Sequence, residues 1–513
     1  MLLQRMTRYG LVTTSKRYLL CICIVSTIFV FVLTKVSLVY NTTPTKHNRD
    51  DSSENPSIYL QSRRFDVIVK MVYAYFYVYK SELPQQILQA YLDHLRVWNH
   101  FKEYCSNLKE TWFDGKIPCK NKLNQSDFIS SFHKTIDDIK ENGFNSSVSR
   151  IPLDNTGFLM NGAHRISAAV VLSQNASFEH HQYTQNAFNW DYNFFRKSGM
   201  SQERLNIVVL EWMKIQMTLP YLKSFVFIVS VLSNNYNKDE AMREIVEMQC
   251  SKDNSIFYEV QVNFTRNGMQ QLVTHMYGKQ PFTYTKLKKI MSKFNSTYIG
   301  KFLFIFTKGI KHLDECKTRI RKLYNDTDQT STVHIPETIE RNLILAEMIL
   351  NSNSIQFMNY AKNASECYLI ANEMARRYIN KPIKALPGIF IGRDDVMVNS
   401  GTVLAIYGIR KRTDIHLLFL REIINELALL GKERKIVFQA HAFKDKSLSK
   451  GDRKDQFGSN VTTNKWALFY DPHNFGYCYG IKFVSLEQLI RYKRMQNDLE
   501  DVQLIKNFYK SNV

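Results

Sequence analysis

The sequence predicts an α/β (α+β) protein that is attached to a membrane by one N-terminal helix. Two strand-like apolar runs, at 224–232 and 301–307, are each followed by a charged helical stretch. A third apolar run, from Tyr18 to Leu33, carries no charge and is long enough to begin a membrane span. Of the 513 residues 44% are hydrophobic and 13% aromatic, which is globular composition with enough apolar material for two or three domains.

The N-terminus predicts a single-pass type II membrane protein. The apolar run continues past Lys35 to Tyr40, so the segment spans about 30 Å as a helix if the lysine side chain reaches toward the membrane surface. Four basic residues precede the run: Arg5, Arg8, Lys16 and Arg17. Positively charged flanks of a membrane span stay in the cytosol. We therefore expect a cytosolic tail at 1–17, a membrane anchor in the lipid bilayer at 18–40 and a polar stem at 41–60. The C-terminus is then luminal, in the Golgi or endoplasmic reticulum. A cleaved signal peptide is the alternative.

Sequons and cysteines fit a luminal body. Nine Asn-x-Ser/Thr sequons occur, at Asn41, Asn124, Asn145, Asn175, Asn263, Asn295, Asn325, Asn363 and Asn460. Two of the eight cysteines lie in the anchor, and the other six are Cys105, Cys119, Cys250, Cys316, Cys367 and Cys478. We expect disulfides, with Cys105 and Cys119 as the local pair; buried free thiols are the alternative. None of the cysteines forms a CxxC pair, which argues against zinc.

The formal net charge of +21 favours anionic partners such as nucleotides or acidic glycans. The basic residues are scattered, and the sequence has no arginine-rich arm and no RNA-binding signature. We therefore expect no nucleic acid partner.

The apolar spacing divides the body of the chain into three parts. The first, at 61–220, has helical patterns at 65–103 and 201–219, and at 149–172 a strand, a turn, a second strand (Phe158–Met160), a turn and a helix. An α/β middle region follows at 221–335. The last part, at 336–513, begins with a long helix pair at 337–378 and continues with a block of strands and helices from residue 387.

A candidate phosphate site lies in MNGAHRISAAVVL, residues 160–172. The helix is expected to begin near Ala163 or His164, just after Asn161 and Gly162, so that His164 and Arg165 fall in its first turn. Backbone N–H groups and the helix dipole favour an anion at such a position. Gly162 would allow close approach of a phosphate, and Arg165 would bind it through two N–H groups. A surface turn with a basic pair is the alternative.

This segment resembles the signature of the ParB/sulfiredoxin-like superfamily, in which a strand pair leads to a G-x-H-R turn and the next helix binds nucleotide phosphates. Gly162, His164 and Arg165 match that signature, and the resemblance covers some 25 residues. Ala163 stands where sulfiredoxin has its cysteine, so its redox chemistry is not expected. The resemblance implies a nucleotide ligand and a general base on a preceding helix, for which Asp93, His94 and Glu103 are candidates.

The C-terminal block resembles the nucleotidyltransferase fold, in which a strand runs into a Gly-Ser turn, followed by a helix, G-x-R and a D-x-D strand. The corresponding residues are Ser400, Gly401, Thr402, Arg410, Asp414 and His416. The Gly-Ser pair is inverted here, and His416 replaces the second carboxylate that would hold a metal ion. The resemblance implies Mg²⁺ or Mn²⁺ with a nucleotide, but these departures predict a degenerate domain; residues 480–506 match the family's closing strand and helices.

Three classes of function remain open at this stage. The first is a luminal nucleotide-dependent transferase of phosphoryl or nucleotidyl type, acting on a glycan or glycoprotein. The second is a Golgi glycosyltransferase of other mechanism, for which Asp394 and Asp395 could be a metal-binding acid pair; an exposed turn is the alternative for these two residues. The third is a non-catalytic membrane-anchored protein that binds a nucleotide or glycan.

Overall fold

The computed structural model describes residues 53–80, 83–107, 124–147, 150–182, 189–219, 221–233, 236–278, 283–292, 294, 298–307, 310–324, 333–362, 364–377, 382–383, 386–390, 393–411, 415–419, 441–442 and 465–512. The predicted tail, membrane anchor and most of the stem lie outside these residues. Within the described part of the chain, no helix has both the length and the apolar character needed to cross a bilayer. Residues 54–513 form one compact unit, and its mixture of helices and sheets confirms the α/β (α+β) class.

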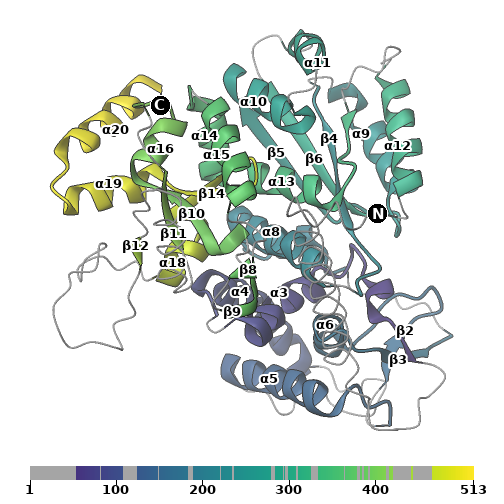
Figure 1. Cartoon of the computed structure of the whole chain (residues 1–513). Coiled ribbons are helices and arrows are strands. Elements are labelled where there is room, and N and C mark those ends of the chain that lie inside the picture. The colour runs from purple at the N-terminus through teal and green to yellow at the C-terminus, as the bar shows by residue number, and fades with distance from the viewer. Residues whose placement is uncertain are drawn as a thin grey trace, which may run out of the picture. The chain divides into compact units, whose positions relative to one another are not determined.

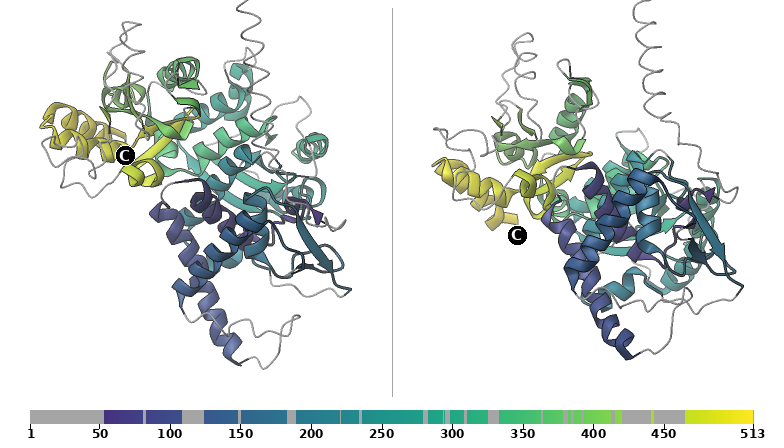
Figure 2. Two further views of the ribbon diagram at one scale, coloured as in Figure 1. Left: turned by 60° about the horizontal axis from the view of Figure 1, so that its bottom comes forward. Right: turned by 90° about the horizontal axis from the view of Figure 1, so that it is seen from below.

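The N-terminal part consists of helices packed beside a small sheet (Figures 1 and 2). Its helices are α3 (Phe65–Tyr79), α4 (Gln85–Asn107), α5 (Gln125–Asn142), α6 (Ala163–Val171), α7 (Tyr192–Lys197) and α8 (Gln202–Thr218). The sheet has the order β1-β3-β2, with β1 (Ser53–Glu54), β2 (Ile151–Leu153) and β3 (Ala176–His180). α3 is buried along most of its length and packs against α4, α6 and α8.

The predicted second strand at Phe158–Met160 is wrong. This segment makes only one isolated bridge, between Leu153 and Leu159, and the partner of β2 is the later strand β3, which runs parallel to it. The carboxylate of Asp154 accepts hydrogen bonds from the backbone N–H groups of Thr156 and Phe158, which curls the chain immediately after β2. The turn therefore occupies residues that a regular hairpin would need for pairing.

The middle region contains an antiparallel sheet of order β5-β6-β4-β7. Its elements are β4 (Val226–Val231), α9 (Asp239–Ile245), the π-helix η4 (Val246–Cys250), β5 (Tyr258–Phe264), α10 (Arg266–Tyr277), α11 (Thr283–Met291), β6 (Tyr298–Phe306), α12 (Ile310–Leu323) and β7 (Val333–His334). Alternate residues of β4 and β6 face opposite sides of the sheet. One face packs against α9 and α12, and the other joins the main core; Figure 1 shows α9 and α12 together beside the sheet.

The C-terminal part carries a five-stranded mixed sheet of order β12-β11-β10-β14-β13. Its elements are α13 (Ile339–Ile349), α14 (Ser352–Tyr360), α15 (Ala364–Arg377), β8 (Pro382–Ile383), β9 (Leu386–Phe390), the 3₁₀ helix η5 (Arg393–Asp395), β10 (Val396–Asn399), α16 (Ser400–Ile406), β11 (His416–Phe419), β12 (His441–Ala442), α18 (Lys465–Tyr470), η7 (Pro472–Asn474), β13 (Phe475–Cys478), β14 (Ile481–Val484), α19 (Leu486–Met495) and α20 (Leu499–Asn512). The predicted helix pair at 337–378 is three helices, because Asn351 caps α14 by accepting from the N–H of Ser354.

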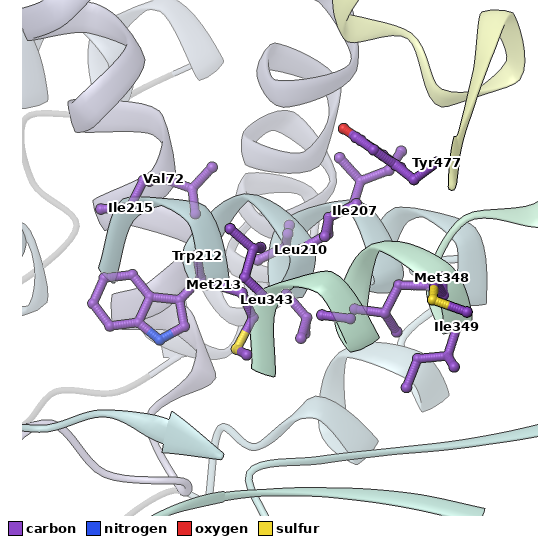
Figure 3. Close-up of a cluster of buried hydrophobic side chains, with 14 of the residues drawn as sticks. Val72, Ile207, Leu210, Trp212, Met213, Ile215, Leu343, Met348, Ile349 and Tyr477 are labelled. Atoms are coloured by element: carbon purple, nitrogen blue, oxygen red, sulfur yellow. The ribbon is translucent and has the colours of Figure 1, made fainter. Parts of the chain in front are cut away.

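One continuous hydrophobic core joins these parts. Figure 3 shows its centre, where Trp212 and Met213 of α8 lie beside Leu343 of α13, with Tyr477 of β13 nearby. Trp212 and Tyr477 are among the largest side chains that are almost completely buried. α8 therefore packs against elements that lie more than a hundred residues later in the chain.

Two disulfides cross-link the described part of the chain. Cys250 of η4 pairs with Cys316 of α12, and Cys367 of α15 pairs with Cys478 of β13, with Cα–Cα distances of 5.5 and 6.4 Å. The expectation of disulfides is confirmed for these four cysteines, and the alternative of buried free thiols is wrong for them. The local pair of Cys105 and Cys119 lies outside the residues whose side chains are described.

The sequons provide a further check of the surface. The four sequon asparagines that the structure describes, Asn124, Asn145, Asn175 and Asn263, are all exposed. Each could therefore accept a glycan without disturbing the core.

Candidate functional site

The start of α6 is shaped by the turn that follows β2. The N–H of Met160 donates to the carbonyl oxygen of Pro152 at 3.0 Å, which returns the chain alongside the strand. Gly162 then adopts a left-handed conformation with φ of 84°, and α6 begins at Ala163 as the sequence predicts. Gly162 is the N-cap residue of α6 and has no side chain with which to cap the helix start.

Arg165 lies directly over this helix start. Its Nη1 donates to the carbonyl oxygen of Arg150 at 2.8 Å. A Cβ atom placed on Gly162 would be 3.2 Å from Nη2 of Arg165, so the guanidinium covers the glycine closely. The positive side chain and the positive end of the helix dipole are thus on the same side, which is unfavourable unless an anion lies between or beside them.

His164 is turned toward the neighbouring helices. Its Nε2 is 3.2 Å from the hydroxyl of Tyr91 on α4, and its ring lies 4.6 Å from the ring of Phe132 on α5. The exposed Asn161 accepts a hydrogen bond from the N–H of Gly162 through its own side chain. Of the five residues expected to form the phosphate site, Arg165 is therefore the one whose charged group lies over the helix start.

A buried ionic cluster, formed by Arg64, Asp66, Lys70 and His94, lies behind this turn. Arg64 donates from Nε and Nη2 to the two carboxylate oxygens of Asp66, at 2.8 and 2.9 Å. Lys70 lies 3.2 Å from the same carboxylate and 2.9 Å from Nε2 of His94. Arg64 also donates from Nη1 to the carbonyl oxygen of Leu159 at 2.5 Å, which connects the cluster to the turn before α6.

The protonation states of this cluster follow from its surroundings. Burial alone would raise the pKa of Asp66, but Arg64 and Lys70 hold it well below its usual range. Burial, and then the charge of Lys70, lowers the pKa of His94 well below 6.5. Asp66, Lys70 and His94 are completely buried, so the cluster supports the turn and has no access to a substrate. Sequence reasoning missed it, although Asp66 and Lys70 at i and i+4 in an otherwise apolar helix were a usable signal.

Two of the three candidate general bases on α4, Asp93 and His94, have described side chains, and their surroundings differ. Asp93 accepts from Nε2 of Gln89 at 3.1 Å and pairs with Nε of Arg204 on α8 at 3.4 Å. His94 belongs to the buried ionic cluster. Glu103 lies within α4, but its side chain is outside the described part of the structure. The structure thus does not place any of these side chains beside Arg165.

At the C-terminal site the elements follow the order that the resemblance implies: strand β10, the Ser400-Gly401 turn, helix α16, Arg410 and strand β11. Ser400 has a φ of 52°, and a Cβ atom on Gly401 would overlap the guanidinium of Arg410. Nη1 of Arg410 donates to Asp501 of α20 at 2.8 Å. The protein's own arginine therefore fills the space at the glycine of this turn.

The remaining residues of this site have structural partners or are not described. The hydroxyl of Thr402 accepts from the N–H of His416 at 2.8 Å, and Asn399 pairs with His416 in the antiparallel ladder of β10 and β11. Asn399 is buried, and its amide group makes no hydrogen bond to the residues that the structure describes. Asp414 lies outside the described residues.

The acid pair Asp394-Asp395 belongs to an ion network in the centre of the molecule. Asp394 lies 3.4 Å from Nζ of Lys214 on α8 and 3.2 Å from Nζ of Lys482 on β14, and Lys214 also pairs with Glu211 at 2.8 Å. Lysines rather than further carboxylates face Asp394, and Asp395 is buried. The reading of this pair as an exposed turn is wrong, because η5 packs between α8 and the C-terminal sheet.

Burial would raise the pKa of Asp394, but the two lysines hold it well below its usual range. Burial would lower the pKa of Lys214, but Asp394 and Glu211 raise it well above 10.5. Asp394 and Lys214 are therefore both charged at neutral pH, whereas burial lowers the pKa of Lys482.

No group of three or more His, Cys, Asp or Glu side chains in the described part of the chain is arranged to hold a metal ion. Searches of family models, curated proteins and solved structures find no match for this chain. The function is therefore argued from the site geometry alone.

Proposed function

We propose that the protein is a nucleotide-dependent transferase of phosphoryl or nucleotidyl type, with the nucleotide phosphates bound at the start of α6. The observation that carries this proposal is the position of Arg165 over the left-handed Gly162, the N-cap residue of α6, which has no side chain of its own to cap the helix. A phosphate there would interact with the helix dipole and with the guanidinium together.

The acceptor and the location follow from the rest of the chain. The sequence-predicted anchor, the exposed sequon asparagines and the two disulfides favour a luminal protein of the Golgi or endoplasmic reticulum, where glycans or glycoproteins are the acceptors. Mg²⁺ or Mn²⁺ would enter with the nucleotide and would supply charge neutralisation for its phosphates.

Replacing Arg165 with alanine should weaken nucleotide binding roughly 10- to 100-fold, because an arginine–phosphate pair contributes about 1.5–3 kcal/mol. Arg165→Lys should recover only part of the affinity, since lysine cannot bind two oxygens at once. A thermal-shift screen of the full chain against nucleotides and sugar nucleotides, with and without Mg²⁺ or Mn²⁺, would identify the ligand, and calorimetry would then measure each variant.

The matched control is Arg63→Ala, which removes an exposed arginine close to the buried ionic cluster and should bind as the parent does. If the parent binds no nucleotide, or if Arg165→Ala binds as tightly as the parent, the start of α6 is a structural turn and the proposal fails.

A second candidate is a non-catalytic membrane-anchored protein that binds a nucleotide or glycan. It is favoured by Arg410, which is fixed by Asp501 in the space beside Gly401, where the nucleotidyltransferase fold needs room for phosphates. A glycosyltransferase of other mechanism is less well supported, because Asp394 pairs with two lysines. Transfer of labelled phosphate or nucleotide to a glycoprotein acceptor would separate the first candidate from the second.

A further inference from the structure

A cavity that shares no residue with the start of α6 lies between α10, α13, α15 and the turn that joins β13 to β14. Its volume is about 170 Å³, and its walls include the rings of His275, Tyr368 and Tyr479 together with the apolar side chains of Met276 and Met348. The volume corresponds to roughly five or six water molecules, which is smaller than most ligand pockets. It would therefore hold one flat ring of a ligand, with the rest of the ligand outside.

Tyr479 reaches this cavity from a strained backbone position. Tyr479 and Gly480 both have positive φ, of 49° and 75°, in the two-residue turn of the β13–β14 hairpin. Such turns favour Asn or Gly at the first position, and a bulky residue there is uncommon. The ring of Tyr479 stacks on His275 with centroids 3.5 Å apart and lies 5.2 Å from Tyr368. Strain of this kind is typical of functional positions.

Basic residues surround the cavity on the side of His334. Arg341 of α13 lines the cavity. Nζ of Lys286 on α11 lies 4.3 Å from the centre of the Tyr277 ring. The centre of that ring is in turn 4.9 Å from the centre of the His334 ring. Lys317 and Arg321 are one turn apart on α12 and act electrostatically on both His334 and Lys286.

The basic rim (Lys286, Lys317, Arg321 and Arg341) brings four cations together. Among the described residues, Asp314 and Glu337 act on these groups, and Glu337 pairs with Arg341 at 3.1 Å. Burial, and then the charge of Arg321, lowers the pKa of both Lys286 and Lys317. Nε of Arg321 is buried and makes no hydrogen bond to any residue in the described ranges. An anion at the rim would relieve this crowding of like charges.

We propose that this cavity binds a small ligand made of a flat ring and a phosphate group, the chemistry of a nucleoside monophosphate. The ring enters the aromatic and apolar cavity beside Tyr479, and the phosphate stays at the basic rim. This site is independent of the nucleotide site proposed at the start of α6.

The test is calorimetry of the full chain with AMP and UMP as probes, and with adenosine and inorganic phosphate as the two halves of the ligand. Binding of a monophosphate should weaken at least tenfold when Lys286→Gln and Lys317→Gln are combined. Lys288→Gln, an exposed lysine on the same helix as Lys286, should leave it unchanged. Adenosine and inorganic phosphate should each bind much more weakly than AMP.

Tyr479→Asn separates binding from folding. Asparagine suits the left-handed turn position better than tyrosine, which offsets part of the packing lost with the ring, and thermal denaturation of the variant checks that it stays folded. Loss of the stacking ring should nevertheless weaken monophosphate binding roughly tenfold. Equal binding by Tyr479→Asn and the parent, or binding of inorganic phosphate as tight as that of AMP, would overturn the proposal.

Arg165→Ala distinguishes the two proposed sites. We expect Arg165→Ala to keep monophosphate binding and the Lys286→Gln, Lys317→Gln variant to lose it. This result supports the cavity as the binding site, independently of the site proposed at α6. Monophosphate binding that is lost in Arg165→Ala and kept in the lysine variant assigns the ligand to α6 and overturns the cavity proposal.

Discussion

Replacement of Asp66 by alanine should lower the free energy of unfolding by about 3–5 kcal/mol, the usual result of removing one partner from a buried ionic group. Asp66 is completely buried and is the acid that faces both Arg64 and Lys70. Without Asp66, the cations Arg64 and Lys70 remain buried beside His94. Because they are buried, water cannot solvate them in place of the lost carboxylate. Urea denaturation of the full chain at pH 7 measures the change.

The control is Asp138→Ala on α5, whose exposed carboxylate accepts from Asn142 and should change the stability by no more than about 0.5 kcal/mol. Adding Lys70→Met to Asp66→Ala should recover part of the loss, because one uncompensated charge is then removed. A loss below 1 kcal/mol for Asp66→Ala would show that the carboxylate does not hold the cluster together.

The second large effect is a loss of stability as the pH falls from 7 to 5. Burial lowers the pKa of His275 to about 3, and burial with the nearby cations Lys317 and Lys286 lowers that of His334 to about 3. Below pH 6.5 both histidines take up a proton in the unfolded chain but stay neutral in the folded protein. Each of these two histidines therefore lowers the free energy of unfolding by about 1.4 kcal/mol per pH unit. Between pH 6.5 and 5 the two together lower it by roughly 4 kcal/mol.

His275→Phe should remove its own share of this pH dependence, roughly 2 kcal/mol between pH 6.5 and 5, since phenylalanine keeps a ring beside Tyr479 but cannot take up a proton. The buried His94, whose pKa is also lowered, contributes in addition to His275 and His334. His312→Phe on α12 is the matched control, because His312 is exposed and should not contribute. Denaturation curves at pH 7, 6 and 5 give the slope for each variant. A slope that is the same in His275→Phe and in the parent would mean that His275 titrates normally in the folded protein.

Local patterns predicted many of the elements, and longer-range contacts explain what they missed. The apolar spacing of α8 and the position of Gly162 were sufficient to predict the helix at 202–218 and the start of α6 at Ala163. The spacing of Asp66 and Lys70 was a local signal for part of the ionic cluster, but its contacts with His94 and with the turn at Leu159 depend on how separate elements pack. The stacking of His275 on Tyr479 joins residues that are about two hundred positions apart, and no local pattern encodes such a contact.

At the candidate sites, too, the order of the elements could be predicted and the long-range contacts could not. The order of strand, turn, helix and strand around Ser400 was expected from the resemblance to the nucleotidyltransferase fold, and β10, α16 and β11 follow one another in that order. The contact of Arg410 with Asp501 could not, because it depends on how α20 packs against the sheet. The same holds for Asp394, whose partners Lys214 and Lys482 are 268 positions apart in the chain.

The position of α8 has a consequence for any attempt to divide the protein. Trp212 and Met213 belong in sequence to the first part, but they share a core with Leu343 and Tyr477, and Lys214 shares Asp394 with Lys482. A fragment that ends after α8 would present an apolar surface with a lysine that has lost Asp394, and a fragment that begins after it would present the complementary surface. Each alone should aggregate, whereas the two produced together should associate into a soluble complex.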